Sequence, residues 1–416
     1  MSDKIKIFTI SDHPLSPSGV GTQTRYIIEG MLKTGKYQFI SFGGAIKHPD
    51  HNPQHTQEWG EDWVIWPVDG YGNPDMVRAM IHQNKPDMLW FMTDPRFYGW
   101  LWSIENEIRP KIPMIYYHVW DNYPYPTYNR PYYLSNDHVA CISKLTYDIL
   151  QTVTPEVDSS YIPHAVNADV FKPLSPEEIQ QFRQQKGLDD KFVCVWNNRN
   201  ARRKQSGTLI FWFKEFLDRV GHDKATLIMH TDAKDVHGQD LEVIIHELGL
   251  TNGEVLFSRE KVDAKDLALM YNMADLTINI SDAEGFGLAT LESLSSGTPI
   301  LVNCTGGLQD QVTDGETSFG IGLEPSSKAI IGSQDVPFIY EDRLAKEDVV
   351  NALVELYEMG PEKRAALGAA GRDWSLKMFN FDDFIERWDT LFTKIYDEKG
   401  SWETRSGYNR YEVREL

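Results

Sequence analysis

The stretch SDAEGFGLATLESLSSGTPI, residues 281–300, joins a glycine-rich turn to a short apolar helix. Gly285 and Gly287 let the backbone approach a ligand closely, and the helix after them would direct unpaired N–H groups and the positive end of its dipole toward that ligand. Gly297 is placed to end the helix. A phosphate group suits the start of such a helix, whereas an ordinary surface helix with solvated side chains is the alternative interpretation.

Two glutamates, Glu284 and Glu292, stand at the two ends of this turn and helix. A helical span of eight residues at about 1.5 Å each would separate their carboxylates by roughly 12 Å, so they cannot share a proton. That distance excludes the close pair of an aspartic protease and disfavours the pair of a retaining glycosidase, which lies about 5 Å apart. The remaining interpretation is that the two glutamates make separate contacts along one elongated ligand.

Short apolar runs rich in β-branched residues alternate with amphipathic helical patterns along the whole chain, which is typical of βαβ units and parallel sheets. The sequence therefore predicts an α/β fold of two doubly wound, Rossmann-like domains that face each other across a cleft, with ligands at the carboxyl ends of the strands. The predicted strands are Lys4–Ser11, Tyr37–Phe42, Asp87–Phe91, Pro113–His118 and Val139–Ile142 in the first domain, and Phe192–Asn197, Thr226–His230, Val255–Phe257, Leu276–Ile280 and Pro299–Asn303 in the second.

The segment YIPHAVNADVFKPLSPEE, residues 161–178, separates these two series of strands. It ends in a capping box at Ser175 with proline at the first helical position, which predicts the start of a new helix. We expect an N-terminal domain at residues 1–165, a C-terminal domain at residues 166–380, and a last helix and polar extension at residues 381–416 that can pack back on the N-terminal domain.

The chain has 416 residues, of which 41% are hydrophobic and 25% charged, the balance of a globular protein. It contains no apolar run of about 20 residues and no signal-peptide core, so we expect a cytoplasmic protein without integral membrane association. Cys141, Cys194 and Cys304 lack metal-ligand spacing and are expected to be reduced. The formal net charge of −20 disfavours nucleic acid as the main partner, because such binding depends on basic residues.

One dense basic cluster, RNARRK at residues 199–204, follows the first predicted strand of the second domain. Arg199 and Lys204 would lie there on the loop between that strand and its helix. Cations at such a place can hold a diphosphate and stabilise negative charge as it develops on a leaving phosphate. A solvated basic surface is the alternative interpretation.

The first domain offers a glycine turn and a histidine. Gly19 and Gly21 follow the first strand, but Thr24 replaces the third glycine of a dinucleotide fingerprint and the next strand ends without an acidic residue, so a nicotinamide-type cofactor is disfavoured. The remaining interpretation of these glycines is a tight turn that lines the cleft. His118 ends the run MIYYH at the edge expected to face the cleft, where a single histidine is as often structural as functional.

Taken together, these residues make the chain resemble the GT-B glycosyltransferases of family 4, retaining enzymes that use nucleotide sugars, over nearly its whole length. The family's two glutamates with seven residues between them correspond to Glu284 and Glu292. Its arginine and lysine, five residues apart, correspond to Arg199 and Lys204. The glycine turn after the first strand and the segment IPHAVNADVFKP are similar to two further family signatures.

The resemblance implies that Glu284 binds hydroxyls of the donor sugar and that Glu292 binds the ribose. It implies that Arg199 and Lys204 stabilise the departing diphosphate. His118 resembles the family's histidine that contacts the transferred sugar. Further substrate contacts are implied for the glycine turns and the backbone amides near them, at Gly19, Gly21, Gly285, Phe286, Gly287 and Leu288.

We expect no cofactor or metal beside the nucleotide-diphosphate sugar, which is a co-substrate, because the chain has no Asp-x-Asp motif and its basic loop already supplies positive charge. Retention is implied by the family, and front-face transfer is favoured because no carboxylate is an obvious nucleophile. The acceptor stays open among a glycan, a small molecule and, disfavoured by the net charge, a modified DNA base. A nucleotide-sugar epimerase of the same fold and a catalytically silent nucleotide-sugar-binding subunit are the competing interpretations.

Overall fold

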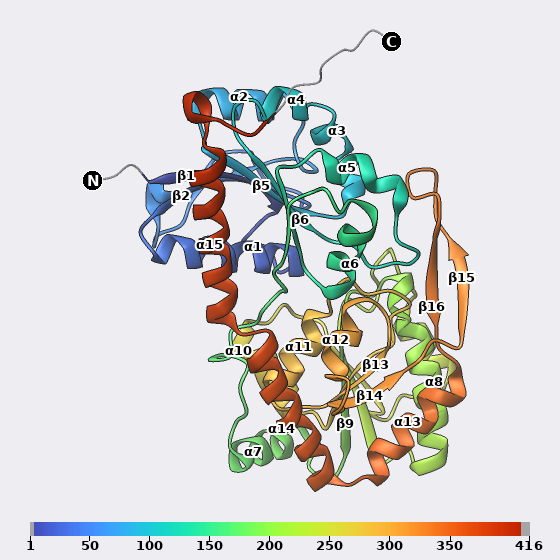
Figure 1. Cartoon of the computed structure of the whole chain (residues 1–416). Coiled ribbons are helices and arrows are strands. Elements are labelled where there is room, and N and C mark those ends of the chain that lie inside the picture. The colour runs from blue at the N-terminus through green and yellow to red at the C-terminus, as the bar shows by residue number, and fades with distance from the viewer. Residues whose placement is uncertain (1–3, 409–416) are drawn as a thin grey trace.

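The N-terminal domain is built on one eight-stranded sheet in the order β3-β4-β2-β1-β5-β6-β7-β8, in a computed structural model that describes residues 4–408 (Figure 1). All neighbouring strands are parallel except β3 and β4. The strands are β1 Ile5–Asp12, β2 Tyr37–Gly44, β3 Gln54–His55, β4 Trp63–Pro67, β5 Met88–Thr93, β6 Met114–His118, β7 His138–Cys141 and β8 Ser159–Tyr161. The helices are α1 Gly19–Lys33, α2 Pro74–Asn84, α3 Gly99–Trp102, α4 Glu105–Ile108, α5 Arg130–Leu134 and α6 Lys144–Val153, with short 3₁₀ turns η1 Gly60–Asp62, η2 Pro95–Phe97 and η3 Thr127–Asn129.

The C-terminal domain holds a six-stranded parallel sheet in the order β11-β10-β9-β12-β13-β14. Its strands are β9 Phe192–Asn197, β10 Ala225–His230, β11 Val255–Ser258, β12 Leu276–Asn279, β13 Ile300–Asn303 and β14 Gly320–Leu323, and a separate antiparallel hairpin is formed by β15 Ser327–Ile331 and β16 Ile339–Arg343. The helices and turns are α7 Pro176–Lys186, η4 Arg202–Lys204, α8 Ser206–Val220, α9 Leu241–Glu247, α10 Ala264–Met273, α11 Leu288–Ser295, η5 Gly306–Leu308, α12 Gln309–Val312, α13 Lys346–Glu358 and α14 Pro361–Met378.

Every strand predicted from the sequence is present, and the α/β class with two parallel sheets is confirmed. Parallel strands covered by helices on both faces need apolar side chains at almost every position, which makes such runs easy to recognise. The capping box at Ser175 and the left-handed residue Gly297, with φ +83°, also form as predicted. The three cysteines are free thiols.

Two segments cross between the domains. The first follows β8 and leads to α7, which begins the C-terminal domain. The second joins α14 to α15 (Phe381–Lys399), which returns along the N-terminal domain (Figure 1). Asp389 of α15 accepts a 2.6 Å hydrogen bond from Tyr37, and Trp388 packs against Trp90 with ring centroids 5.9 Å apart. The chain after α15, including η6 Trp402–Thr404, contacts the N-terminal domain through Arg405 and Asp137, 2.5 Å apart; residues 409–416 of the predicted extension lie outside the described residues.

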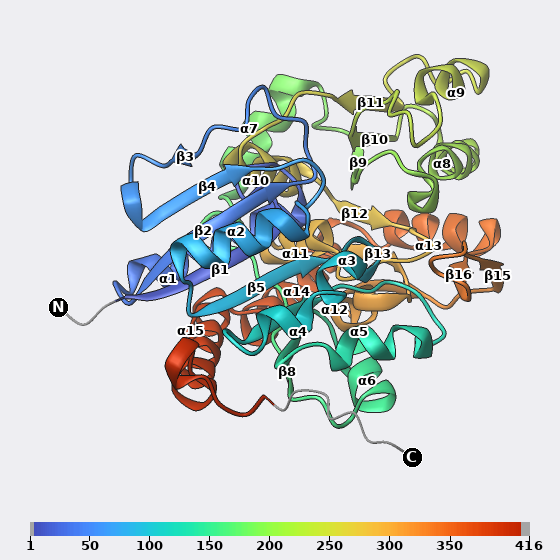
Figure 2. The same ribbon diagram turned by 90° about the horizontal axis from the view of Figure 1, so that it is seen from above.

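A third connection is made by the β15–β16 hairpin, which lies on the side of the molecule opposite to α15 (Figure 2). The amide of Tyr340 donates to the carbonyl of Tyr123 at 2.8 Å, and Asn122 Nδ2 donates to the carbonyl of Tyr340 at 3.0 Å. The Tyr123 and Tyr340 rings stack with centroids 6.4 Å apart. The domains are therefore held on both flanks. Within residues 4–408, no helix has the length and apolar character needed to cross a bilayer.

Candidate functional site

The glycine-rich turn lies between β12 and α11, at the carboxyl end of its strand. Gly287 has φ +90°, and a Cβ there would lie 2.5 Å from Leu308 Cδ2, so glycine is required. A Cβ on Gly285 would lie 3.4 Å from the carbonyl of Trp120 in the other domain. Helix α11 begins without a side-chain cap, and its eight residues leave the first-turn N–H groups suited to an anion. The turn thus sits where both domains meet.

Glu284 of this turn forms a buried ion pair with Lys204 of η4, and Asn279 Nδ2 donates to the same carboxylate at 3.2 Å. Burial works against the charged form of Glu284, but the positive charges of Lys204 and Arg203 outweigh it, so its pKa lies below the usual value. Burial, followed by repulsion from Arg203, lowers the pKa of Lys204 to about 8. Both partners are therefore charged near neutral pH.

Two arginines of the basic cluster have different partners. Arg203 Nη1 donates to the carbonyl of Ala283 at 2.5 Å, and its Nη2 lies 3.4 Å from Asp121 of the N-terminal domain. Arg199 instead pairs with Asp235 at 2.6 Å, and its side chain is 60% exposed. The structure therefore brings Lys204 and Arg203, rather than Arg199, to the turn. Sequence reasoning did not single out Arg203, although it stands directly before Lys204 in the basic cluster.

Glu292 lies on α11 and is held by a short chain of hydrogen bonds. The Tyr271 hydroxyl donates to Glu292 Oε2 at 2.7 Å, and Asn197 Nδ2 at the end of β9 donates to the Tyr271 oxygen at 2.8 Å. Burial raises the pKa of Glu292 to about 7, although the bond from Tyr271 opposes this change. Glu292 is therefore an oriented acceptor. The sequence pattern offered no signal for Tyr271, which belongs to a different helix.

The N-terminal glycines have different environments. Gly19 is the first residue of α1, and a Cβ there would lie 3.0 Å from Leu288 Cδ1 at the start of α11. A Cβ on Gly21 would lie 2.6 Å from the carbonyl of His13 and from Ser16 Oγ, within its own loop. Gly19 thus allows the close approach of the two domains, whereas packing of the loop 12–18 requires a glycine at position 21.

His118 ends β6 at the expected edge of the sheet, but it is fully buried. Its Nε2 lies 3.0 Å from the hydroxyl of Tyr133, and burial lowers its pKa to about 3, so the ring is neutral. The Tyr133 ring covers it with centroids 4.8 Å apart. In this structure His118 has no exposed surface that a ligand could contact.

Known protein families and sequences match part of the chain. Residues 178–374 match the family model described as glycosyl transferases group 1. A GDP-mannose-dependent alpha-(1-6)-phosphatidylinositol monomannoside mannosyltransferase of Mycolicibacterium smegmatis is 27% identical over 229 residues, 53% of each chain. An alpha-monoglucosyldiacylglycerol synthase of Streptococcus pneumoniae is 26% identical over 181 residues, 43% of this chain and 40% of the relative. The chain therefore matches about half the length, or less, of these relatives.

Solved structures match nearly the whole chain. Sucrose-phosphate synthase from Thermosynechococcus elongatus has a TM-score of 0.73 and 17% sequence identity, covering 95% of this chain and 100% of that one. Anabaena Alr3699/HepE in complex with UDP and glucose has a TM-score of 0.68 and 15% identity, covering 94% and 100%. These likenesses confirm the GT-B arrangement of the two domains.

Proposed function

Because residues 178–374 belong to the glycosyl transferases group 1 family, we propose that this chain transfers a sugar from a nucleoside-diphosphate sugar to an acceptor hydroxyl. One observation carries the proposal: Glu284 and Glu292 flank the uncapped start of α11, and two cations lie beside it. A diphosphate at the helix start would leave one carboxylate for the sugar and the other for the ribose. The mannosyltransferase relative is named as GDP-mannose-dependent, and the Anabaena structure contains UDP and glucose, so a hexose donor is the first to test.

The chain's own residues would prepare the leaving group. The turn amides of Phe286, Gly287 and Leu288 would orient the diphosphate, and Lys204 with Arg203 would stabilise the negative charge that grows on it as the sugar–phosphate bond breaks. Glu284 is already paired with Lys204, so its carboxylate is oriented before a sugar hydroxyl arrives. Arg199 would add to this charge once it leaves Asp235.

Transfer would occur on the front face of the sugar. The acceptor oxygen forms its bond to the anomeric carbon on the side from which the phosphate oxygen departs, and its proton passes to that phosphate oxygen. The product keeps the donor's anomeric configuration, and the other products are the nucleoside diphosphate and one proton at neutral pH. Lys204 and Arg203 would supply the positive charge that a metal ion supplies elsewhere, so no metal is required.

Incubation with GDP-mannose, UDP-glucose and related donors, with and without glycan, polyol and lipid acceptors, tests this proposal. We expect release of the nucleoside diphosphate together with a new glycoside, and loss of both in Glu284→Gln. Formation of an epimer of the donor without acceptor would establish the epimerase alternative instead. Tight binding of a donor that is never consumed would indicate a silent binding subunit.

A further inference from the structure

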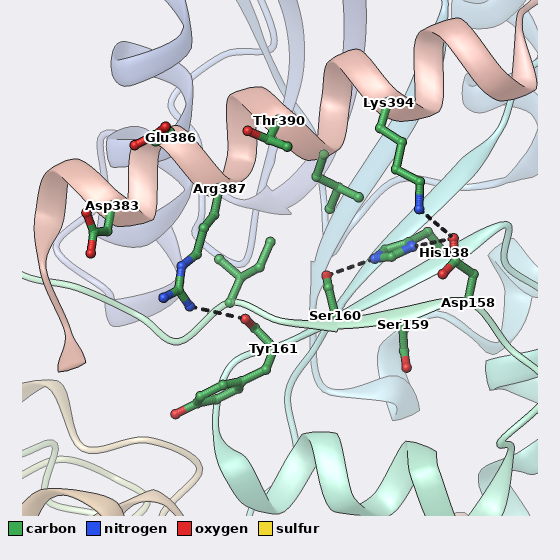
Figure 3. A pocket seen from close by; sticks show the side chains of 12 residues that line it. His138, Asp158, Ser159, Ser160, Tyr161, Asp383, Glu386, Arg387, Thr390 and Lys394 are labelled. Atoms are coloured by element: carbon green, nitrogen blue, oxygen red, sulfur yellow. Dashed lines mark hydrogen bonds and ion pairs between the residues drawn. The ribbon is translucent and has the colours of Figure 1, made fainter.

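A groove between two elements of the N-terminal side lies outside the glycine-rich turn and its basic loop. It has a volume of about 440 Å³ and is formed between the edge strand β8 and helix α15 (Figure 3). Its walls carry charged, hydroxyl and apolar side chains: His138, Asp158, Ser159, Ser160, Tyr161, Ile162, Asp383, Glu386, Arg387, Thr390, Leu391 and Lys394. None of these residues takes part in the donor site described above, so the proposed function leaves this cavity without a role.

The strand side of this groove presents a set of oriented polar groups. His138 is only 2% exposed; its Nε2 lies 2.9 Å from Ser160 Oγ and its Nδ1 lies 3.2 Å from Asp158 Oδ2. The His138 ring, with a weaker effect from Lys394, holds the pKa of Asp158 below its usual value, so the carboxylate stays an acceptor. Fixed hydroxyl, imidazole and carboxylate groups side by side are suited to the hydroxyl groups of a ligand.

The helix side supplies two cations that point toward the strand (Figure 3). Arg387 Nη1 reaches the carbonyl of Tyr161 only at 3.5 Å, and Lys394 Nζ lies 3.8 Å from Asp158 Oδ2. These long distances leave most of their donor capacity unused. Two helical turns, roughly 10 Å, separate the two side chains along α15. Buried Ile162 and Leu391 provide an apolar surface between them.

We propose that this groove is a second ligand site that takes a small polyhydroxy compound with one anionic group, such as a sugar monophosphate. Arg387 binds the anion, because a guanidinium fork matches phosphate and carboxylate oxygens. Asp158 and Ser160, which His138 holds in position, bind the hydroxyls at the other end. A purely anionic ligand would meet the repulsion of Asp158, Asp383 and Glu386, and a neutral sugar would leave most of the donor capacity of Arg387 unused.

The two walls of the groove continue directly into the two crossings between the domains. Ile162 begins the segment that leads from β8 to α7, and Asp383 lies in the first turn of α15, just after the second crossing. Arg387 already joins the walls through Tyr161. A ligand held by both walls would therefore join the two crossing segments.

The Ser160–His138–Asp158 contacts also have the order of a hydrolase triad. In such triads the carboxylate is buried and serves the histidine alone. Here Asp158 is 44% exposed and shared with Lys394, an arrangement that suits ligand binding better than activation of a serine. Covalent labelling of Ser160 by a fluorophosphonate probe would assign the groove to hydrolysis and contradict the proposal.

Titration calorimetry with glucose 6-phosphate, glucose and inorganic phosphate tests the site without relying on transferase activity. We expect glucose 6-phosphate to bind at least about tenfold more tightly than either fragment, and Arg387→Ala to weaken it about tenfold or more. Ser160→Ala should weaken it less, and Arg219→Ala, on the exposed face of α8, should leave it unchanged. Equal binding of phosphate alone, no binding to the wild type, or full binding to Arg387→Ala would overturn the proposal.

Hydrogen exchange of the full chain locates the bound ligand. Glucose 6-phosphate should slow exchange in residues 159–165 and 381–390 of the wild type but not of Arg387→Ala. Binding without protection of these segments would place the ligand elsewhere and contradict the assignment. Because both measurements use the sugar phosphate alone, they stand even if the chain proves not to transfer sugars, and their failure leaves the donor site untouched.

Discussion

Lys204 and Glu284 form an ion pair whose side chains are only 10% and 12% exposed, although they belong to different loops of the C-terminal domain. Removing one partner of such a pair leaves the other charge buried, at a cost of about 3–5 kcal/mol. We therefore expect Lys204→Met to lower the free energy of unfolding by that amount, and Glu284→Gln in the same chain to restore much of it. Urea unfolding of the single and double variants measures this coupling. The exposed pair of Lys4 and Asp62, whose side chains are 39% and 40% exposed, is the control, because its loss should cost less than about 1 kcal/mol. Additive effects of the two buried substitutions would contradict the pairing.

The basic loop should matter more in the transition state than in the ground state, because negative charge grows on the leaving diphosphate. We expect Lys204→Ala and Arg199→Ala each to lower kcat by roughly 10²- to 10³-fold in steady-state assays of nucleoside diphosphate release. Arg202 pairs with Glu341 at 2.9 Å on the same loop, and Arg202→Ala serves as the matched control with a smaller effect. A change confined to KM would instead indicate uniform binding of substrate and transition state.

The raised pKa of Glu292 predicts a pH-dependent stability. Its folded-state pKa of about 7 exceeds the ordinary value of 4.5, so the folded protein binds this proton more strongly than the unfolded chain. The resulting stability is fully present below about pH 4.5 and is lost as the pH rises through about 7. Relative to Glu292→Gln, which can still accept the Tyr271 bond, the wild type should lose about 1–3 kcal/mol across this range. Urea midpoints of both proteins at intervals from pH 4.5 to 8 measure the difference, and a constant difference would show that Glu292 titrates normally.

Gly19 should set how closely the domains approach. A Cβ at this position would lie 3.0 Å from Leu288 Cδ1, so a valine would push the start of α1 away from α11. We expect Gly19→Val to lower kcat/KM for the donor at least about tenfold, in the range of losing a well-oriented contact. Leu288→Ala in the same chain removes the obstructing methyl groups while keeping the backbone amide, and should restore most of the activity. If Leu288→Ala does not restore activity, Gly19 does not set how closely the domains approach each other.

Chelation tests the role given to the basic loop. The chain has no Asp-x-Asp motif, and Lys204 and Arg203 already place positive charge where a dication would be held. We expect activity after exhaustive treatment with EDTA to stay within about twofold of the untreated protein, with any effect of added Mg²⁺ reproduced by other salts. If EDTA abolishes transfer and one metal specifically restores it, the leaving diphosphate must be stabilised by a metal bound to carboxylates and not by the basic loop.

The parallel sheets could be predicted because most of their buried strands are continuous apolar runs. Most of the strands that were not predicted lack this signal: β3 and β8 are short and polar, β14 contains two glycines, and β15 and β16 mix charged and apolar residues. β4, with the sequence WVIWP, is an apolar run that the sequence analysis did not assign. The spacing of Glu284 and Glu292 also follows from local geometry. Their partners do not, because Lys204, Tyr271 and Asn279 come from other elements and meet the glutamates only through the tertiary fold.

Whether two of the predicted side chains are exposed or paired depends on loops whose positions do not follow from the local sequence. Tyr133 covers His118 because the chain after β6 folds back over the end of that strand. Arg199 turns to Asp235, which follows β10 and is a neighbour only in three dimensions. Sequence patterns could therefore indicate candidate residues of the site, but not which of them are covered or paired in the folded chain.

Titration calorimetry with intact nucleotide sugars and with the bare nucleoside diphosphates, against the wild type, Glu284→Gln and Glu292→Ala, tests directly whether one turn binds both ends of the donor. We expect Glu292→Ala to weaken binding of both kinds of ligand by roughly tenfold or more, as for the loss of a hydrogen-bonding carboxylate, and Glu284→Gln to weaken binding of the intact nucleotide sugar only. Equal weakening of the bare diphosphate by Glu284→Gln, or the absence of any nucleotide binding to the wild type, would contradict this expectation.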